Sequence, residues 1–294
     1  SNVVCLTRQV GSNRGADRLS RTACMIVSAL AASLILAACA NTTERYESYT
    51  TALQAKGKMR TERDPDDAPF TKDDLARNFI KIAMYSEYDE ELAAKPTEKI
   101  LGRWEEPIRY TFFGKGVTRE DRKQMRELAF RVSHLTGQKI EPISNKSNFV
   151  IMYLDEAERR KINQEFQERW GDEFAEFNVR WASSWRNPCI GRLFYNKKGE
   201  ITLGLVFIRN EIEGLFRESC LHEEVIQTLG LTNDDDDVRP SIFNDDEEFA
   251  FLTRHDEYLI QMLYDPRLST GMTVKEVTPL LPSVLDDLYP RDET

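Results

Sequence analysis

Histidine is scarce in this sequence. Only His134, His222 and His255 occur among 294 residues, and no two of them stand four residues apart. That spacing places two imidazoles on one face of a helix, where they can bind one zinc ion. A zinc site built from neighbouring histidines is therefore excluded, and three distant histidines that meet in the fold remain the open alternative. The sequence also lacks a glycine-rich phosphate loop, a serine nucleophile elbow and a cysteine–histidine dyad.

Basic residues are too few to balance the acidic ones. There are 40 lysine and arginine residues against 50 aspartate and glutamate residues, which gives a formal net charge of −10. Residues 1–38 hold four arginines and Asp17, or +3, so residues 39–294 carry −13. A surface of this sign argues against nucleic acid or an anionic lipid as the binding partner.

The apolar run Ala23–Ala38 is shorter than the ~20 residues that a membrane-spanning helix needs. Four arginines precede it, and it ends in the sequence LAAC at Cys39, which resembles the lipobox of a bacterial lipoprotein signal. We therefore expect residues 1–38 to be a cleaved signal peptide and Cys39 to carry a lipid that anchors the chain to a membrane. Because Ala40 stands where an aspartate would signal inner-membrane retention, this resemblance implies an outer-membrane protein that faces the periplasm.

Cysteine is also rare, with five residues in the chain. Cys5 and Cys24 lie in the predicted signal peptide and Cys39 is the predicted lipid site, so the rest of the chain holds only Cys189 and Cys220. In an oxidising envelope compartment two such cysteines favour one disulfide. We expect this bridge to join a strand to the start of the helix that follows it. Two free buried thiols are the alternative.

The chain after the signal divides into a polar segment and one domain. Residues 39–70 are charged and lack apolar periodicity, which predicts a flexible tether, whereas residues 71–294 predict a single domain. Thr71 with Asp74 and Thr118 with Asp121 have the spacing of a capping box. Periodicity and turn signals predict helices over about 71–88, 118–137, 155–170 and 215–229, and strands over 108–112, 148–154, 190–195 and 201–208, the last two joined as a hairpin and 148–154 at the centre of the sheet.

Residues 219–234 have the layout of a zinc-peptidase helix without its histidines. Glu223, Gln227 and Asn233 occupy the three ligand positions of the spacing HExxHxxGxxH, and Gly230 keeps the glycine. Glu224 keeps the residue type of the water-activating position and could act as a general base. Carboxylate and amide oxygens suit calcium, magnesium or manganese better than zinc. We therefore expect neither zinc nor another cofactor, and a calcium or other hard cation remains the alternative.

This motif, together with segments outside it, carries a resemblance to a known family. Residues 103–107, 219–234, 240–245 and 255–268 resemble a family of proteobacterial lipoproteins that contain the domain of unknown function 2927. More remotely, the motif helix, a turn at Phe243 and a closing helix near Asp256 are similar in order to matrixin-type metzincins. Phe243 stands where those peptidases place a methionine beneath the metal. The resemblance implies an α+β, zincin-like (metzincin-like) domain with a mixed sheet, a motif helix and a closing C-terminal helix.

Two interpretations of the motif remain open. Glu223 and Gln227 share a helical face, so they form either a repurposed polar site or a hydrogen-bonded anchor for the loop after the helix, and the second is favoured. The resemblance then implies a lipid-anchored envelope protein whose degenerate, non-catalytic domain binds a peptide or an envelope protein. The alternative is a metallopeptidase in which Glu223, Gln227 and Asn233 or Asp234 hold a hard cation and Glu224 is the base.

Overall fold

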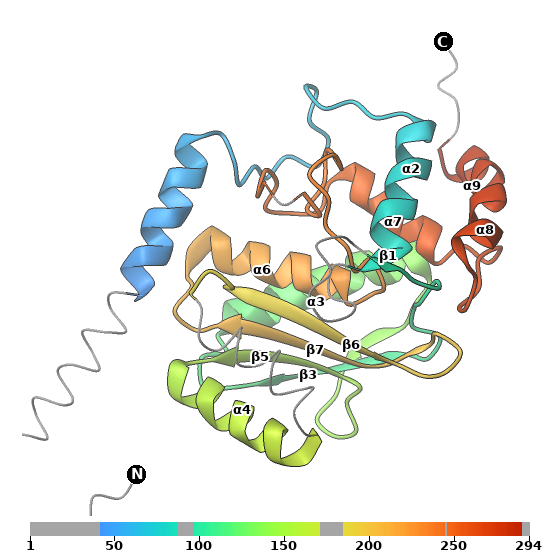
Figure 1. Cartoon of the computed structure of the whole chain (residues 1–294). Coiled ribbons are helices and arrows are strands. Elements are labelled where there is room, and N and C mark those ends of the chain that lie inside the picture. The colour runs from blue at the N-terminus through green and yellow to red at the C-terminus, as the bar shows by residue number, and fades with distance from the viewer. Residues whose placement is uncertain (1–41, 87–96, 171–184, 245, 290–294) are drawn as a thin grey trace, which may run out of the picture. The chain divides into compact units, whose positions relative to one another are not determined.

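A mixed five-stranded sheet forms the centre of the structure. The computed structural model describes residues 42–86, 97–170, 185–244 and 246–289, and the chain from Tyr46 onward forms one compact unit. The sheet has the order β4-β3-β5-β7-β6 (Figure 1). Its strands are β3 (Ile108–Phe113), β4 (Ile140–Pro142), β5 (Phe149–Leu154), β6 (Cys189–Tyr195) and β7 (Ile201–Arg209).

Strand β5 is the central strand, as its uninterrupted apolar sequence predicts. It runs parallel to β3 and β7, and β4 runs parallel to β3. Ile151 and Tyr153 belong to the main hydrophobic core, whereas Met152 and Leu154 belong to a second cluster, because successive side chains of a strand point to opposite faces. Strand β6 is antiparallel to β7, which confirms the predicted hairpin. The α+β class and the mixed sheet are likewise confirmed.

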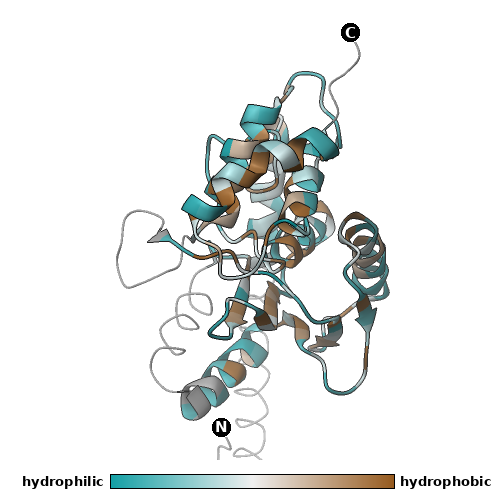
Figure 2. Cartoon of the chain, turned by 90° about the vertical axis from the view of Figure 1, so that its right-hand side faces the viewer, coloured by the Kyte–Doolittle hydropathy of each residue, from teal (hydrophilic) through white to brown (hydrophobic). Residues whose placement is uncertain are grey.

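Helices cover both faces of this sheet. Figure 1 shows α3 and α6 on one face and α4 on the other, with α2, α7, α8 and α9 beyond the end of α6. In Figure 2 hydrophobic and hydrophilic residues alternate along these helices, as expected where one side of each helix packs inward. Besides the helix of residues 42–55, the helices are α2 (Lys72–Ala83), α3 (Arg119–Thr136), α4 (Glu156–Trp170), α6 (Gly214–Gln227), α7 (Arg254–Leu263), α8 (Val274–Val277) and α9 (Leu281–Leu288). The 3-10 turn η1 (Thr278–Leu280) and the short strands β1 (Tyr85–Ser86) and β2 (Thr97–Glu98) lie between them.

The predicted helix starts are confirmed in atomic detail. Thr71 and Asp74 cap α2, and Thr118 and Asp121 cap α3, each pair exchanging the two reciprocal bonds of a capping box. Helix α3 ends at Gly137, whose φ of 72° lies in the left-handed region. Helix α2 ends at Ala83, earlier than the sequence periodicity suggested, because the chain turns there into β1.

A disulfide joins the edge strand to the motif helix. The Sγ atoms of Cys189 and Cys220 are bonded, and their Cα atoms lie 5.8 Å apart. Cys189 is the first residue of β6, and Cys220 lies in the middle of α6 with no exposed surface. The predicted bridge between these two cysteines is therefore confirmed, but it meets α6 near the middle of the helix and not at its start.

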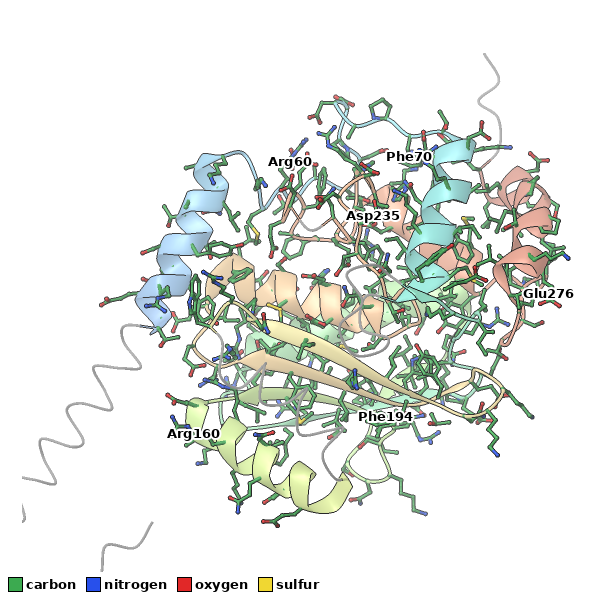
Figure 3. The ribbon with its side chains drawn as sticks, viewed as in Figure 1. Arg60, Phe70, Arg160, Phe194, Asp235 and Glu276 are labelled. Atoms are coloured by element: carbon green, nitrogen blue, oxygen red, sulfur yellow. A yellow bond between two sulfur atoms is a disulfide. The ribbon has the colours of Figure 1, made fainter. Side chains whose placement is uncertain are left out.

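The segment predicted as a tether differs from that expectation over most of its length. Residues 42–55 are helical, and Tyr46, Leu53 and Met59 are buried. The backbone amides of Met59 and Arg60 donate to the carbonyls of residues 247 and 248, and the Arg60 side chain pairs with Asp67 (Figure 3). Tyr46, Tyr49 and Leu53 are spaced by three and four residues, which is one face of a helix, but so short a run is not distinctive within a charged segment.

The predicted signal peptide and Cys39 lie outside the described residues. Within the described part of the chain, no helix is both long enough and apolar enough to cross a membrane.

Candidate functional site

The motif residues lie on α6 and on the loops that follow it. The last carbonyl groups of this helical region, which no further helical turn can satisfy, accept hydrogen bonds from three side chains. Trp104 Nε1 donates to the carbonyl of Thr228 at 2.8 Å. Tyr264 Oη and Lys99 Nζ donate to the next two carbonyls, each at 3.3 Å. The end of the motif helix is therefore fixed by three side chains from two distant parts of the sequence, residues 99–104 and Tyr264.

Position 230 can hold only glycine, because of its backbone conformation and the close approach of Gly102. Its φ is 125°, and a Cβ atom at this position would lie 2.1 Å from the carbonyl oxygen of Gly102. Only glycine adopts this conformation at low cost and leaves room for the approaching backbone. The glycine that the motif predicts thus directs the chain from α6 toward Asn233 and Asp234.

Glu224, the predicted base, faces the edge strand. Only 5 % of its surface is exposed, and its Oε2 atom lies 3.0 Å from where a Cβ of Gly191 on β6 would stand. Cys220 and Thr228, four residues before and after it, contact the same strand through the disulfide and through Thr228 Cγ2. One stripe of α6 therefore packs on β6, and the carboxylate of Glu224 lies within that contact.

The three predicted ligand positions do not act as one set. Gln227 Nε2 donates to both carboxylate oxygens of Asp234 at 2.9 Å. Asn233 is only 2 % exposed, and its Nδ2 donates at 3.1 Å to the carbonyl of Lys81 in α2. The side chain beside Gln227 is thus that of Asp234, whereas Asn233 holds the loop against α2. Glu223 lies one residue before Glu224 on α6 and is partly exposed.

The loop after this pair is tied to α2 as well. Lys81 Nζ donates to Asp235 at 2.7 Å and to Asp237 at 3.0 Å. Asp235 is labelled in Figure 3 on the loops beside α2. The acidic run that follows the motif is therefore in part a set of ion pairs that fasten the loop to α2.

Phe243 lies in a buried turn that Asp256 of α7 holds by hydrogen bonds. Phe243 has no exposed surface, and its amide donates to Ser241 Oγ at 3.0 Å. Asp256 accepts from Ser241 Oγ at 2.5 Å and from the amide of Ile242 at 3.2 Å. It also caps α7 through Thr253. Asp256 therefore holds the turn of residues 241–243 against α7.

His222 lies on α6 next to the motif and is a packing residue. Its ring centroid is 4.7 Å from that of Phe251. Burial lowers the pKa of His222 to about 4, and the charge of Arg131 acts in the same direction. The imidazole is therefore neutral in the folded protein near neutral pH.

This neutral histidine predicts a loss of stability in mild acid. Below about pH 6.5 the unfolded chain binds a proton at His222 that the folded chain does not bind until about pH 4. Between pH 6.5 and 5 the wild type should lose about 2 kcal/mol more unfolding free energy than His222→Gln. Urea unfolding across this range measures the difference. Identical profiles for His222→Gln and wild type would contradict the assignment.

Metal-ligating side chains do not form a cluster in the described part of the chain. Among those residues, no three or more histidine, cysteine, aspartate and glutamate side chains are grouped to hold a metal ion. Gln227 and Asp234 are the two motif side chains that meet, and the amide nitrogen rather than an oxygen faces the carboxylate. This geometry favours the anchor interpretation of the motif.

Comparison with known proteins gives a family but no activity. The family model described as "Protein of unknown function (DUF2927)" matches residues 72–283, which include every strand of the five-stranded sheet and the whole motif. No curated protein matches the chain.

Proposed function

Since this chain belongs to the family described as protein of unknown function (DUF2927), we propose from its geometry that it is a non-catalytic binding module, a degenerate metallopeptidase-like domain that holds a peptide or an envelope protein. The observation that carries this proposal is the pairing of Gln227 with Asp234. A side chain at a metal-ligand position is used to fasten the loop after the motif helix. The retained scaffold order, with its motif helix, its buried turn and α7, is what supports the zincin-like assignment.

Strand β6 is the proposed contact surface for the peptide. It is the last strand in the sheet order, pairing with β7 on one side, and α6 packs beside it through the disulfide and Glu224. An extended peptide can bind an edge strand by adding backbone hydrogen bonds, and the side chains of the strand then provide selectivity. Phe194, labelled in Figure 3, is one such side chain on β6.

Binding and cleavage are tested in one experiment. The full chain is titrated with a library of extended envelope-derived peptides, and hydrogen exchange is measured at the β6 amides with and without each binding peptide. We expect protection of β6 without cleavage, and an unchanged affinity in Glu224→Gln. Binding that leaves the β6 amides unprotected, or an absence of binding across the library, would contradict the proposal.

The alternative is a metallopeptidase that uses a hard cation held by oxygen atoms of Glu223, Gln227 and Asp234, with Glu224 as the base. The contact between Gln227 and Asp234 favours this set over one with Asn233. Elemental analysis of protein purified without chelator decides between the two functions. About one calcium, manganese or zinc ion per chain that Glu223→Ala loses, with peptide cleavage that Glu224→Gln abolishes, would establish the enzyme.

The proposed location is the periplasmic side of the outer membrane, with the chain held by a lipid on Cys39. The support is the sequence LAAC at Cys39 and the arginine-rich, apolar stretch before it. Fatty-acid labelling that persists in Cys39→Ser would contradict the anchor.

A further inference from the structure

Four aromatic rings enclose a small cavity beside the first turn of the motif helix. Its volume is about 270 Å³. Tyr46 and Tyr49 come from the helix of residues 42–55, Trp185 precedes β6, and Phe216 lies in α6. Three segments far apart in the sequence therefore meet around one space, and Glu247 lies in its wall.

The ring contacts form a closed circuit. Tyr46 lies 6.3 Å from Trp185 and 6.0 Å from Phe216 between ring centroids. Tyr49 lies 6.5 Å from Trp185 and 5.6 Å from Phe216. All four rings line the same cavity, and a cation–π interaction needs a cation within about 6 Å of a ring centroid. Adjacent rings are inclined by 50° to 81°, so they meet in edge-to-face or tilted contacts and do not stack in parallel.

The tyrosine and tryptophan at one side of this cavity are fixed in place. Tyr46 Oη donates to the carbonyl of Trp185 at 2.6 Å, and Tyr46 is buried. Tyr49 is 36 % exposed, so the cavity has an entrance at the protein surface beside it. Because the walls of this partly open cavity are already ordered, binding a ligand does not require the entropy loss of ordering them.

The electrostatics at the entrance favour a positive charge. Burial raises the pKa of Tyr49, and the charges of Glu247 and Glu223 raise it further. Both carboxylates therefore act on this corner of the cavity. Arg186 also lines it but is exposed, so solvent and salt screen its charge more strongly.

We propose that this cavity binds the alkylated ammonium group of a ligand, with the four ring faces surrounding the cation and Glu247 balancing its charge. Aromatic enclosures with a nearby carboxylate suit quaternary and methylated ammonium groups, because the ring faces attract a cation that is too apolar to be strongly hydrated. Phe216, Glu223 and Gln227 recur on α6 at intervals of seven and four residues, so the cavity lies on the same helical face as the motif. The inference does not depend on peptide binding at β6.

Small cations test the proposal directly. The full chain is titrated calorimetrically with tetramethylammonium, with choline and with 3,3-dimethylbutan-1-ol, the neutral isostere of choline. We expect both cations to bind and the neutral alcohol to bind at least about tenfold more weakly, because only the cations gain the ring electrostatics. Equal affinities for choline and the alcohol, or no binding of either cation at millimolar concentration, would overturn the proposal.

Variants locate the binding to this cavity. Tyr49→Leu removes a half-exposed ring and should weaken choline binding about tenfold, and Glu247→Gln should weaken it about threefold. Tyr195→Leu is the matched control, because Tyr195 is 42 % exposed and lies at the end of β6 outside this lining. Thermal unfolding confirms that each variant is folded. Choline affinity that is unchanged in Tyr49→Leu would place the cation elsewhere and overturn the assignment, whereas β6 protection by peptides would be unaffected by that result.

Discussion

Gly230→Ala is expected to cost at least about 4 kcal/mol of unfolding free energy. The added Cβ would stand 2.1 Å from the Gly102 carbonyl oxygen, at a backbone φ of 125°. A carbonyl oxygen in a packed backbone cannot rotate away as a side chain can, so either the strained residue or the segment at Gly102 must move. Moving that segment also disturbs Trp104, which holds the end of α6. Urea unfolding followed by circular dichroism measures the loss.

Gly137→Ala is the matched control for this variant. Gly137 also has a positive φ, of 72°, but an added Cβ there meets no atom within 4 Å. Gly137→Ala should lower the unfolding free energy by only about 1 kcal/mol, which is the cost of holding alanine at a positive φ. If both substitutions cost the same, the close approach of Gly102 to Gly230 is not what requires glycine in the motif. Failure of Gly230→Ala to fold, with Gly137→Ala folded, agrees with the expected result.

The helix starts and the sheet centre were predictable because their signals are local. Thr71 with Asp74 and Thr118 with Asp121 satisfy backbone amides only three residues away, so sequence spacing suffices. The apolar run 149–154 must be buried on both faces wherever it lies, and the structure places it at the centre of the sheet. The disulfide was predictable because only Cys189 and Cys220 remain after the predicted signal and lipid site, and two cysteines in an oxidising compartment favour one bridge.

The contacts of the motif and the aromatic cavity depend on long-range packing and were harder to predict. The motif spacing singled out Gln227 and Asn233 as equivalent, but Asn233 binds a carbonyl in α2, which lies 152 residues away in sequence. Tyr46 and Tyr49 gave one usable signal, a spacing of three on a helix. No local pattern connects these tyrosines with Trp185 or Phe216. The cavity could not be predicted because it forms where residues 46–55, predicted to be part of a flexible tether, pack beside those two rings.

Asp256→Ala should cost about 3–5 kcal/mol of unfolding free energy. The carboxylate has no exposed surface and accepts hydrogen bonds from Ser241 Oγ, the amide of Ile242, and the amide and hydroxyl of Thr253. Removing it leaves the Ser241 hydroxyl and the amides of Ile242 and Thr253 without this acceptor, whereas the Thr253 hydroxyl can still donate to the carbonyl of Pro240 at 2.8 Å. Each buried donor without an acceptor costs about 1–3 kcal/mol unless the structure relaxes. The same change frees the turn of residues 241–243 from α7, so hydrogen exchange of the amides in that turn should become faster as stability is lost.

The comparison with Asp74→Ala separates the cap from the turn. Asp74 has the same place in the capping box of α2 but is partly exposed and holds no second turn. Its removal should cost about 1 kcal/mol, the usual value of a cap. The excess of Asp256→Ala over Asp74→Ala then measures the bonds to Ser241 and Ile242, which fix Phe243 and, through the hydrogen bond from the Asp235 amide to the Phe243 carbonyl at 3.0 Å, the loop that carries Asp234. Equal costs for the two variants would mean that Asp256 acts only as a cap, and that the motif loop is held by Gln227 and α2 alone.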